Sequence, residues 1–344
     1  MKKIYHLLWM ALFCIIVTGC GSEHPTDYEV GVIYTTEYYD KSEIVYLDNS
    51  WQPVGKTKFR YSNMTYGGFY NCLTENNIVY LLPKGKSQRL DCGKVCAFDR
   101  VSGEMTEYDF GRVNITDYNY DEKYVYAVSN LNGIYYLDRI NKETRELTTY
   151  EHYESDLDKI TLIDGKVYGI SVGLEGDRDT YELCLIDMDK KSYTKVCDLE
   201  IKRSPVFLEN HNGKIYIPND KELFVYDTIN HNSYIIELPY SDGYNLNKKD
   251  NVLYIGHTDI FNGTTSHITT LDLATEKISH VMDYDGIILQ MEVVENSIYI
   301  RNYDKLLLYK IGETKEPILK NSYALEHGGN FYPGSFFLKP IETK

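Results

Sequence analysis

The chain has 344 residues, of which 43% are hydrophobic and 25% charged; this balance excludes an intrinsically disordered chain and a multi-span membrane protein. A formal net charge of −15 argues against a nucleic-acid-binding surface, which needs a basic footprint. Tyrosine is unusually common, with 34 residues, and it favours strands over helices. The length suits two or three average domains or one large all-β unit.

The first 20 residues have the pattern of a secretion signal. Two lysines precede an apolar run of about 14 residues, which is too short to span a bilayer comfortably as a helix. The run ends in Val17-Thr18-Gly19-Cys20. This sequence resembles the lipobox of bacterial lipoproteins, a family in which cleavage precedes the Cys and the thiol carries a diacylglycerol. The alternative is an ordinary secretion signal with an incidental cysteine.

The lipobox resemblance implies where the protein is held. It predicts a signal peptide over 1–19, lipidation of Cys20 and a short tether over 20–29. Two or more acyl chains hold a protein on a membrane where one would be marginal. The resemblance therefore implies a lipid anchor at the extracytoplasmic face of a bacterial cell membrane, with no other membrane contact.

A short β motif ending in tyrosine recurs seven times after the tether. The seven tyrosines are Tyr34, Tyr80, Tyr126, Tyr168, Tyr216, Tyr254 and Tyr299, separated by 46, 46, 42, 48, 38 and 45 residues. Six copies are followed by an apolar pair and an aspartate, namely Asp48, Asp99, Asp138, Asp187, Asp227 and Asp272. We interpret the tyrosines as packing between repeats. The aspartates are expected to open tight turns by accepting hydrogen bonds from backbone N–H groups.

Each repeat contains four predicted strands. One more strand is predicted ahead of each later tyrosine motif, over 69–73, 114–118, 159–163, 206–209, 244–247 and 287–293. Four short strands every 40–50 residues are typical of a β-propeller blade. The first repeat lacks its innermost strand, and the apolar segment 334–338 near the end of the chain has no repeat of its own. We therefore predict an all-β, seven-bladed propeller over 30–344, closed by the C-terminal strand completing the first blade.

These repeats resemble seven-bladed propellers of the broad WD-like or YVTN type, although their own signatures are degenerate. The resemblance implies a binding or scaffold module for a glycan, peptide or protein partner rather than an enzyme. Streptogramin-lyase-like propellers show that the fold also permits a lyase or hydrolase. That alternative places a site at the central mouth of the long-loop face and requires His257, His327 and an acid to converge.

The loops between the second and third strands are longest in the even-numbered repeats, over 83–94, 172–180 and 256–267. Loops on a rigid scaffold commonly carry function, and the first of these loops is basic in an acidic chain. We predict a monomer that binds an acidic protein or carbohydrate on the face formed by these long loops. The candidate ligand-binding residues are Lys84, Lys86, Arg89, Arg178, His257, His327 and Tyr332.

Neither a catalytic group nor a metal or cofactor site is predicted from the motifs. The alternative is Ca²⁺ near Asp177 and Asp179, although the D-x-D-x-D-G loop is absent.

Five cysteines follow Cys20: Cys72, Cys92, Cys96, Cys184 and Cys197. An odd number outside the cell implies at least one free thiol or an intermolecular pair. Cys184 and Cys197 lie on the two arms of one predicted hairpin, and we expect them on one face near disulfide reach. We nevertheless interpret most of the five as buried thiols, because a propeller core needs no disulfides, and the pairing stays open.

Overall fold

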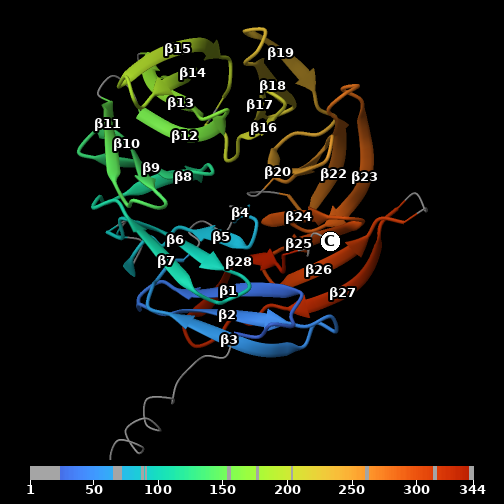
Figure 1. The fold of residues 1–344 in the computed structure, drawn as a ribbon. Coiled ribbons are helices and arrows are strands. Elements are labelled where there is room, and N and C mark those ends of the chain that lie inside the picture. Colours follow the sequence, from blue (N-terminus) through green and yellow to red (C-terminus); the bar gives the residue numbers. More distant parts are fainter. Residues whose placement is uncertain are drawn as a thin grey trace, which may run out of the picture.

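The computed structural model describes residues 24–64, 72–86, 89, 91–152, 156–175, 178–202, 204–259, 263–312 and 316–340. In these residues, 28 strands form seven antiparallel sheets of four strands each. The sheets are arranged in a ring as the blades of a propeller (Figure 1). Within the same residues, no helix is long and apolar enough to cross a membrane.

The blades follow one another along the chain, and each runs from an innermost to an outermost strand. Blade one contains β28 (Phe331–Leu338), β1 (Val30–Thr36), β2 (Ser42–Leu47) and β3 (Pro53–Phe59). Blade two contains β4 (Leu73–Glu75), β5 (Ile78–Leu81), β6 (Lys94–Asp99) and β7 (Met105–Asp109). Blade three contains β8 (Ile115–Tyr120), β9 (Tyr124–Leu131), β10 (Ile134–Asn141) and β11 (Leu147–His152).

The remaining four blades repeat this order. Blade four contains β12 (Asp156–Ile163), β13 (Lys166–Glu175), β14 (Arg178–Asp187) and β15 (Ser192–Leu199). Blade five contains β16 (Glu209–His211), β17 (Lys214–Asn219), β18 (Glu222–Asp227) and β19 (Asn232–Glu237). Blade six contains β20 (Gly243–Lys249), β21 (Val252–His257), β22 (Thr265–Asp272) and β23 (Ile278–Asp285). Blade seven contains β24 (Gln290–Val294), β25 (Ser297–Arg301), β26 (Lys305–Lys310) and β27 (Ile318–Ala324).

The ring closes as the sequence predicts. Strand β28 pairs antiparallel with β1, so that Phe336 lies opposite Val32 and Phe337 opposite Gly31. The first and last strands of the chain therefore lie side by side in one blade (Figure 1). Because the last strand of the chain completes the first blade, strand β1 has no unpaired edge where the ring closes.

The core lies between neighbouring blades. Six of the seven repeated tyrosines are buried, and Tyr254 is half-buried against the core between blades six and seven. One core cluster, for example, combines Tyr80 and Val95 of blade two with Ile115 and Val125 of blade three. The predicted packing role of the tyrosines is confirmed.

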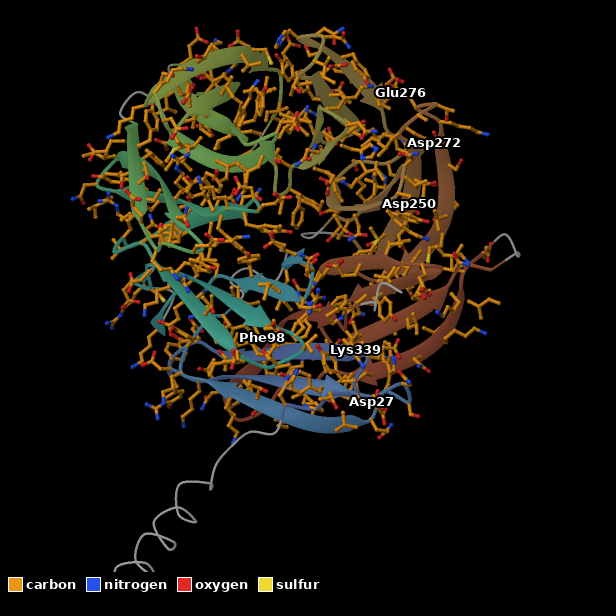
Figure 2. The ribbon with its side chains drawn as sticks, in the orientation of Figure 1. Asp27, Phe98, Asp250, Asp272, Glu276 and Lys339 are labelled. Carbon is orange, nitrogen blue, oxygen red and sulfur yellow. The ribbon has the colours of Figure 1, made fainter. Side chains whose placement is uncertain are left out.

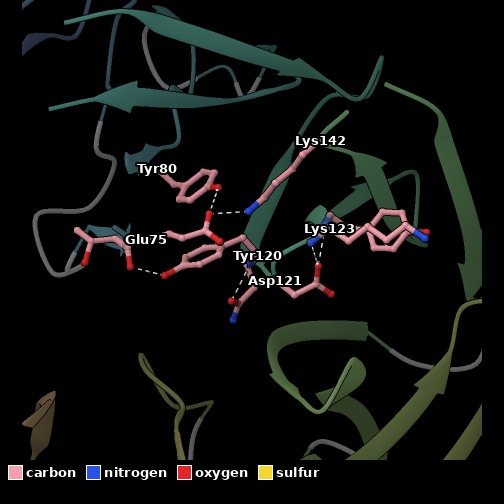
Figure 3. A network of polar contacts seen from close by, with 9 residues as sticks. Glu75, Tyr80, Tyr120, Asp121, Lys123 and Lys142 are labelled. Atoms are coloured by element: carbon pink, nitrogen blue, oxygen red, sulfur yellow. Dashed lines mark hydrogen bonds and ion pairs between the residues drawn. The ribbon is translucent and has the colours of Figure 1, made fainter. Parts of the chain in front are cut away.

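A polar network also joins blades two and three (Figure 3). Lys142 Nζ lies 2.5 Å from the Glu75 carboxylate, which also accepts a 2.7 Å hydrogen bond from Tyr80 Oη. The rings of Tyr80 and Tyr120 stack with centroids 4.5 Å apart. The Tyr120 hydroxyl donates to the carbonyl of Thr74. The two tyrosines thus combine apolar area with satisfied hydroxyl groups.

Five of the six repeated aspartates open turns as predicted. In each, one carboxylate oxygen accepts hydrogen bonds from two backbone N–H groups of the following loop; these are Asp48, Asp99, Asp187, Asp227 and Asp272. The prediction is wrong for Asp138, which is buried within β10. Strand β10 continues to Asn141, whose side chain accepts from Glu143 N and Thr144 N instead.

Side-chain hydrogen bonds link neighbouring innermost strands. The amide of Asn119 donates to the carbonyl of Ile160, and that of Asn245 donates to Ile288, both at 3.1 Å. Gln290 clamps Phe336 by donating to its carbonyl at 2.8 Å and accepting from its N–H at 3.0 Å. The free edge of an innermost strand carries unpaired backbone groups, and these side chains satisfy some of them.

The connections define two faces of the ring. We call the upper face the one carrying the loops between second and third strands and the connections between blades. The lower face carries the turns between first and second and between third and fourth strands. Asp250, Asp272 and Glu276 of blade six, labelled in Figure 2, belong to lower-face turns.

The prediction for one long loop is partly wrong. Strands β13 and β14 continue as a ladder in which Val172 pairs with Tyr181 and Glu175 with Arg178, so most of 172–180 is strand. The blade-six loop is also shorter than expected, because β21 extends to His257 and β22 begins at Thr265. The described residues between β5 and β6, over 82–86, 89 and 91–93, lie outside the named strands and form an upper-face loop.

Most of the cysteines are buried thiols as predicted, but Cys184 and Cys197 do not share a face as expected. The described cysteines, Cys72, Cys92, Cys96, Cys184 and Cys197, are free thiols. Cys184 packs in the core between blades three and four, whereas a register shift that leaves Val196 of β15 without a partner turns Cys197 toward the core between blades four and five. The two thiols therefore lie on opposite faces of the sheet, because a bulge reverses the alternation of side chains.

Candidate functional site

A cleft of about 570 Å³ opens on the upper face beside the first three blades. Its charged lining comes from different loops. The cations are Arg60 after β3, Lys86 and Lys94 on the loop between β5 and β6, and Arg112 on the connection to blade three; the acids are Asp40, Asp91 and Asp109. Two further carboxylates just outside the lining, Glu107 and Asp138, pair with Lys94 and Arg112.

Arg112 is a fixed cation in the cleft wall. Its Nε donates to Asp138 Oδ2 at 3.1 Å, and its guanidinium lies 3.9 Å from the centre of the Tyr136 ring. Thr149 Oγ1 donates to the other Asp138 oxygen at 2.5 Å. Burial raises the pKa of Asp138, although Thr149 and Arg112 counteract it. Asp138 of blade three therefore holds a cleft arginine in place and does not open a turn.

Lys94 is held at the cleft by carboxylates of β7. Its Nζ lies 2.6 Å from Glu107 and 3.7 Å from Asp109. The hydrogen bond from Lys94 lowers the pKa of Glu107, as does the hydroxyl of Tyr61. Because the side chains of Lys94 and Glu107 are partly exposed, solvent weakens this pair and its role is to position Lys94 more than to stabilise the fold.

The two remaining cations face solvent. Lys86 Nζ pairs with Asp40 Oδ2 at 2.6 Å, and about half of each side chain is exposed. Arg60 is exposed and has no ion-pair partner among the described residues. A guanidinium with its fork open to solvent is suited to bind a carboxylate through two parallel hydrogen bonds.

The cleft also contains a thiol that is poorly suited to nucleophilic chemistry. Cys92 is half-buried in the lining, and burial raises its pKa. A raised pKa keeps a thiol protonated near neutrality, whereas catalysis requires the thiolate. The lining is equipped for charge recognition.

The structure separates the predicted basic-loop residues. Lys86 lines the cleft, and Arg89 is exposed on the same loop, where its backbone N–H donates to the carbonyl of Lys86 at 3.1 Å. Lys84 is instead buried, and its ammonium donates to the carbonyl of Ile115. Burial lowers the pKa of Lys84 to about 8.

Two other predicted residues, Tyr332 and Arg178, do not line this cleft. The hydroxyl of Tyr332, in β28, donates to Asn63 Oδ1 at 2.5 Å. Arg178 begins β14 of blade four, opposite Glu175. Cys20 and Asp177 lie outside the described residues, whereas Asp179 pairs with Leu174 in a strand ladder. Across the described segments, no group of three or more His, Cys, Asp or Glu side chains is arranged to hold a metal ion.

The two predicted histidines do not meet. His257 is buried at the end of β21, with Nε2 2.8 Å from Thr269 Oγ1, and burial lowers its pKa to about 4. His327 is exposed on the last connection, where Nε2 donates to the carbonyl of Tyr303 at 2.8 Å. Because the two rings share no contact in the described structure, they provide no paired acid and base for the alternative enzyme reading.

Arg60 and Arg112 are cleft residues that the sequence reasoning missed. Both lie on connections between blades, whereas the prediction followed the loops between second and third strands. The sequence did contain a signal for them, because the blade connections before and after the basic loop each carry an arginine.

Comparison with known structures places the chain in a fold class. The structure resembles a functionally unknown protein from Desulfotomaculum acetoxidans DSM 771, with TM-score 0.60 and 10% identity over 91% of this chain and 98% of that one. It also resembles a provisionally assigned 6-phosphogluconolactonase from Bacteroides fragilis NCTC 9343, with TM-score 0.59 and 11% identity over 91% and 98%. No protein-family model and no curated protein matches the chain. At these identities the likeness shows the fold alone: a seven-bladed β-propeller.

Proposed function

We propose that this propeller is a binding module, anchored by lipid on Cys20 at the outer face of a bacterial membrane. Its upper-face cleft receives an acidic protein or carbohydrate partner. The observation that carries the proposal is Arg60, an exposed guanidinium in the cleft lining that has no carboxylate partner among the described residues, in a chain that is strongly acidic as a whole. Opposite charge steers encounter and fixes orientation more than it adds affinity.

The place where the chain enters the propeller supports a cleft that faces away from the membrane. His24 packs on the lower face, with Nδ1 2.9 Å from Tyr46 Oη and Nε2 2.9 Å from the carbonyl of Arg100. Three residues lie between Cys20 and His24, and the four steps along an extended chain span at most about 14 Å. A lipid on Cys20 would therefore hold the lower face near the membrane and leave the upper-face cleft accessible.

Replacing the lipidated residue tests the anchor. Cys20→Ala is expected to abolish fatty-acid incorporation and to release the protein from the membrane fraction, because no other thiol lies at the predicted cleavage point. Metabolic labelling with a clickable fatty acid measures the first effect, and fractionation of cells measures the second. Cys92→Ala is the matched control and should leave both unchanged. Continued labelling of the Cys20 variant would refute the anchor.

Removing charge from the cleft tests the partner site. The double variant Arg60→Ser/Lys86→Ser is expected to weaken partner binding about 5- to 30-fold, at about 0.5–1 kcal/mol per rim charge, and to flatten its salt dependence. The melting temperature should change little, because both side chains face solvent. Photocrosslinkers placed at Lys86 or Lys190 on intact cells would identify the partner, and titrations with that partner would give the affinities.

The control removes equal charge from the other face. Lys190→Ser/Lys277→Ser alters two exposed lower-face lysines and should leave affinity within about twofold. Lys84 is excluded from the cleft variant, because replacing a buried ammonium that donates to Ile115 is expected to reduce stability. Loss of binding in the lower-face control, with retention in the cleft variant, would show that the partner binds the other face.

A further inference from the structure

A second cavity, of about 330 Å³, opens where the innermost strands of blades one, two and seven reach the lower face. Its lining includes Arg100, Lys339 and the carboxyl of Glu292, together with apolar side chains such as Val294 and Phe336. Lys339 and Asp27 are labelled in Figure 2, and Lys339 Nζ lies 3.9 Å from Asp27 Oδ1. The cavity is distinct from the upper-face cleft and shares no lining residue with it.

Arg100 is a buried cation whose hydrogen-bond partners are all neutral. Its Nε donates to the carbonyl of Asn77 at 3.3 Å, Nη1 donates to Leu338 at 2.6 Å, and Nη2 donates to the carbonyl of Asn76. No carboxylate of the described residues lies within ion-pair distance of it. A guanidinium has five N–H donors, so these bonds leave two for a ligand.

Glu292 lines the same cavity but forms no ion pair with Arg100. It projects from β24 into the same cavity, and Asn247 Nδ2 donates to its Oε2 at 2.9 Å. Burial raises the pKa of Glu292 to about 7, so much of the carboxyl is protonated near neutrality. A buried cation without a charged partner is costly, and a bound anion would offset that cost.

We propose that this cavity binds a small organic oxyanion, a carboxylate or phosphate monoester, with its oxygens toward Arg100 and its apolar part against Val294 and Phe336. Arginine suits either group because its planar fork matches two oxygens. The volume admits a metabolite-sized ligand and excludes a folded partner. The proposal stands independently of the lipid anchor and of the upper-face cleft.

The test uses the full chain in detergent, with glycerol 3-phosphate and succinate as probes. Calorimetric titrations at constant ionic strength compare the unaltered protein with Asn77→Asp and Asn77→Ser. Asn77 is exposed at the mouth and binds Arg100 through its backbone carbonyl, so both variants should fold and melt alike. The added carboxylate of Asn77→Asp is expected to weaken binding of at least one probe about tenfold. The Asn77→Ser affinity should stay within about twofold.

Each outcome decides the proposal. Binding that falls in Asn77→Asp and persists in Asn77→Ser supports the site. Binding of neither probe, or equal binding by all three proteins, overturns it. Phosphatidylglycerol vesicles then separate the possible sources of phosphate: displacement of glycerol 3-phosphate points to a lipid headgroup, and retention points to a soluble anion.

Discussion

A chain ending at Asn330 is expected to be insoluble or unfolded, because it lacks the strand that closes the ring. Phe336 and Phe337 are almost fully buried in two different inter-blade cores. Deleting one such side chain typically costs about 3–5 kcal/mol, and a whole domain is stable by only about 5–15 kcal/mol. Truncation would also expose the edge of β1, a template for aggregation. Soluble yield, size-exclusion chromatography and thermal unfolding measure the effect.

A single buried substitution, compared with an exposed one, tests whether lost packing causes the instability. Phe336→Ala should destabilise the protein by about 3–5 kcal/mol while the purified protein remains monomeric. Ile229→Ala, at an exposed apolar residue of a lower-face turn, should change stability by less than about 0.5 kcal/mol. A monomeric truncated chain with an unchanged melting temperature would contradict the role of β28 in closure.

The fold could be predicted because its repeats are local. Each tyrosine motif combines strand propensity with a buried face, and five of the six aspartates begin a turn within a few residues. Asp138 shows the limit of that reasoning, since the turn function passed to Asn141 when the strand ran on by three residues. Cys197 shows another limit, because a single bulge in β15 reverses the face that its side chain occupies.

The candidate sites could be predicted only in part, because they depend on contacts between blades. The basic loop indicated Lys86, but nothing local separates it from Lys84, which the fold buries. Arg112 becomes a cleft residue through Asp138, a partner from another strand of blade three. The second cavity, on the lower face, is lined by Arg100 of blade two and Glu292 of blade seven. The repeat pattern does not predict that these two residues lie close together.

Glu292→Gln is expected to stabilise the protein at pH 8 and to have little effect at pH 5. Burial raises the pKa of Glu292 from 4.5 to about 7, against the lowering effects of Asn247, Gln290 and Arg100, while Glu209 raises it further. The folded state therefore holds this proton more tightly than the unfolded chain. Its stabilising contribution is complete below about pH 4.5 and is lost as the pH rises through about 7.

The size of that change follows from the shift, because each pKa unit corresponds to about 1.4 kcal/mol. Glutamine mimics the protonated acid, so the variant should gain up to about 3 kcal/mol over the unaltered protein at pH 8. At pH 5 the two should agree within about 1 kcal/mol, since Asn247 can still donate to the side-chain carbonyl. Urea unfolding at both pH values gives the free energies. Glu104→Gln, at an exposed carboxylate, is the control and should cause the same small change at both; if Glu292→Gln did likewise, the buried acid would not titrate as proposed.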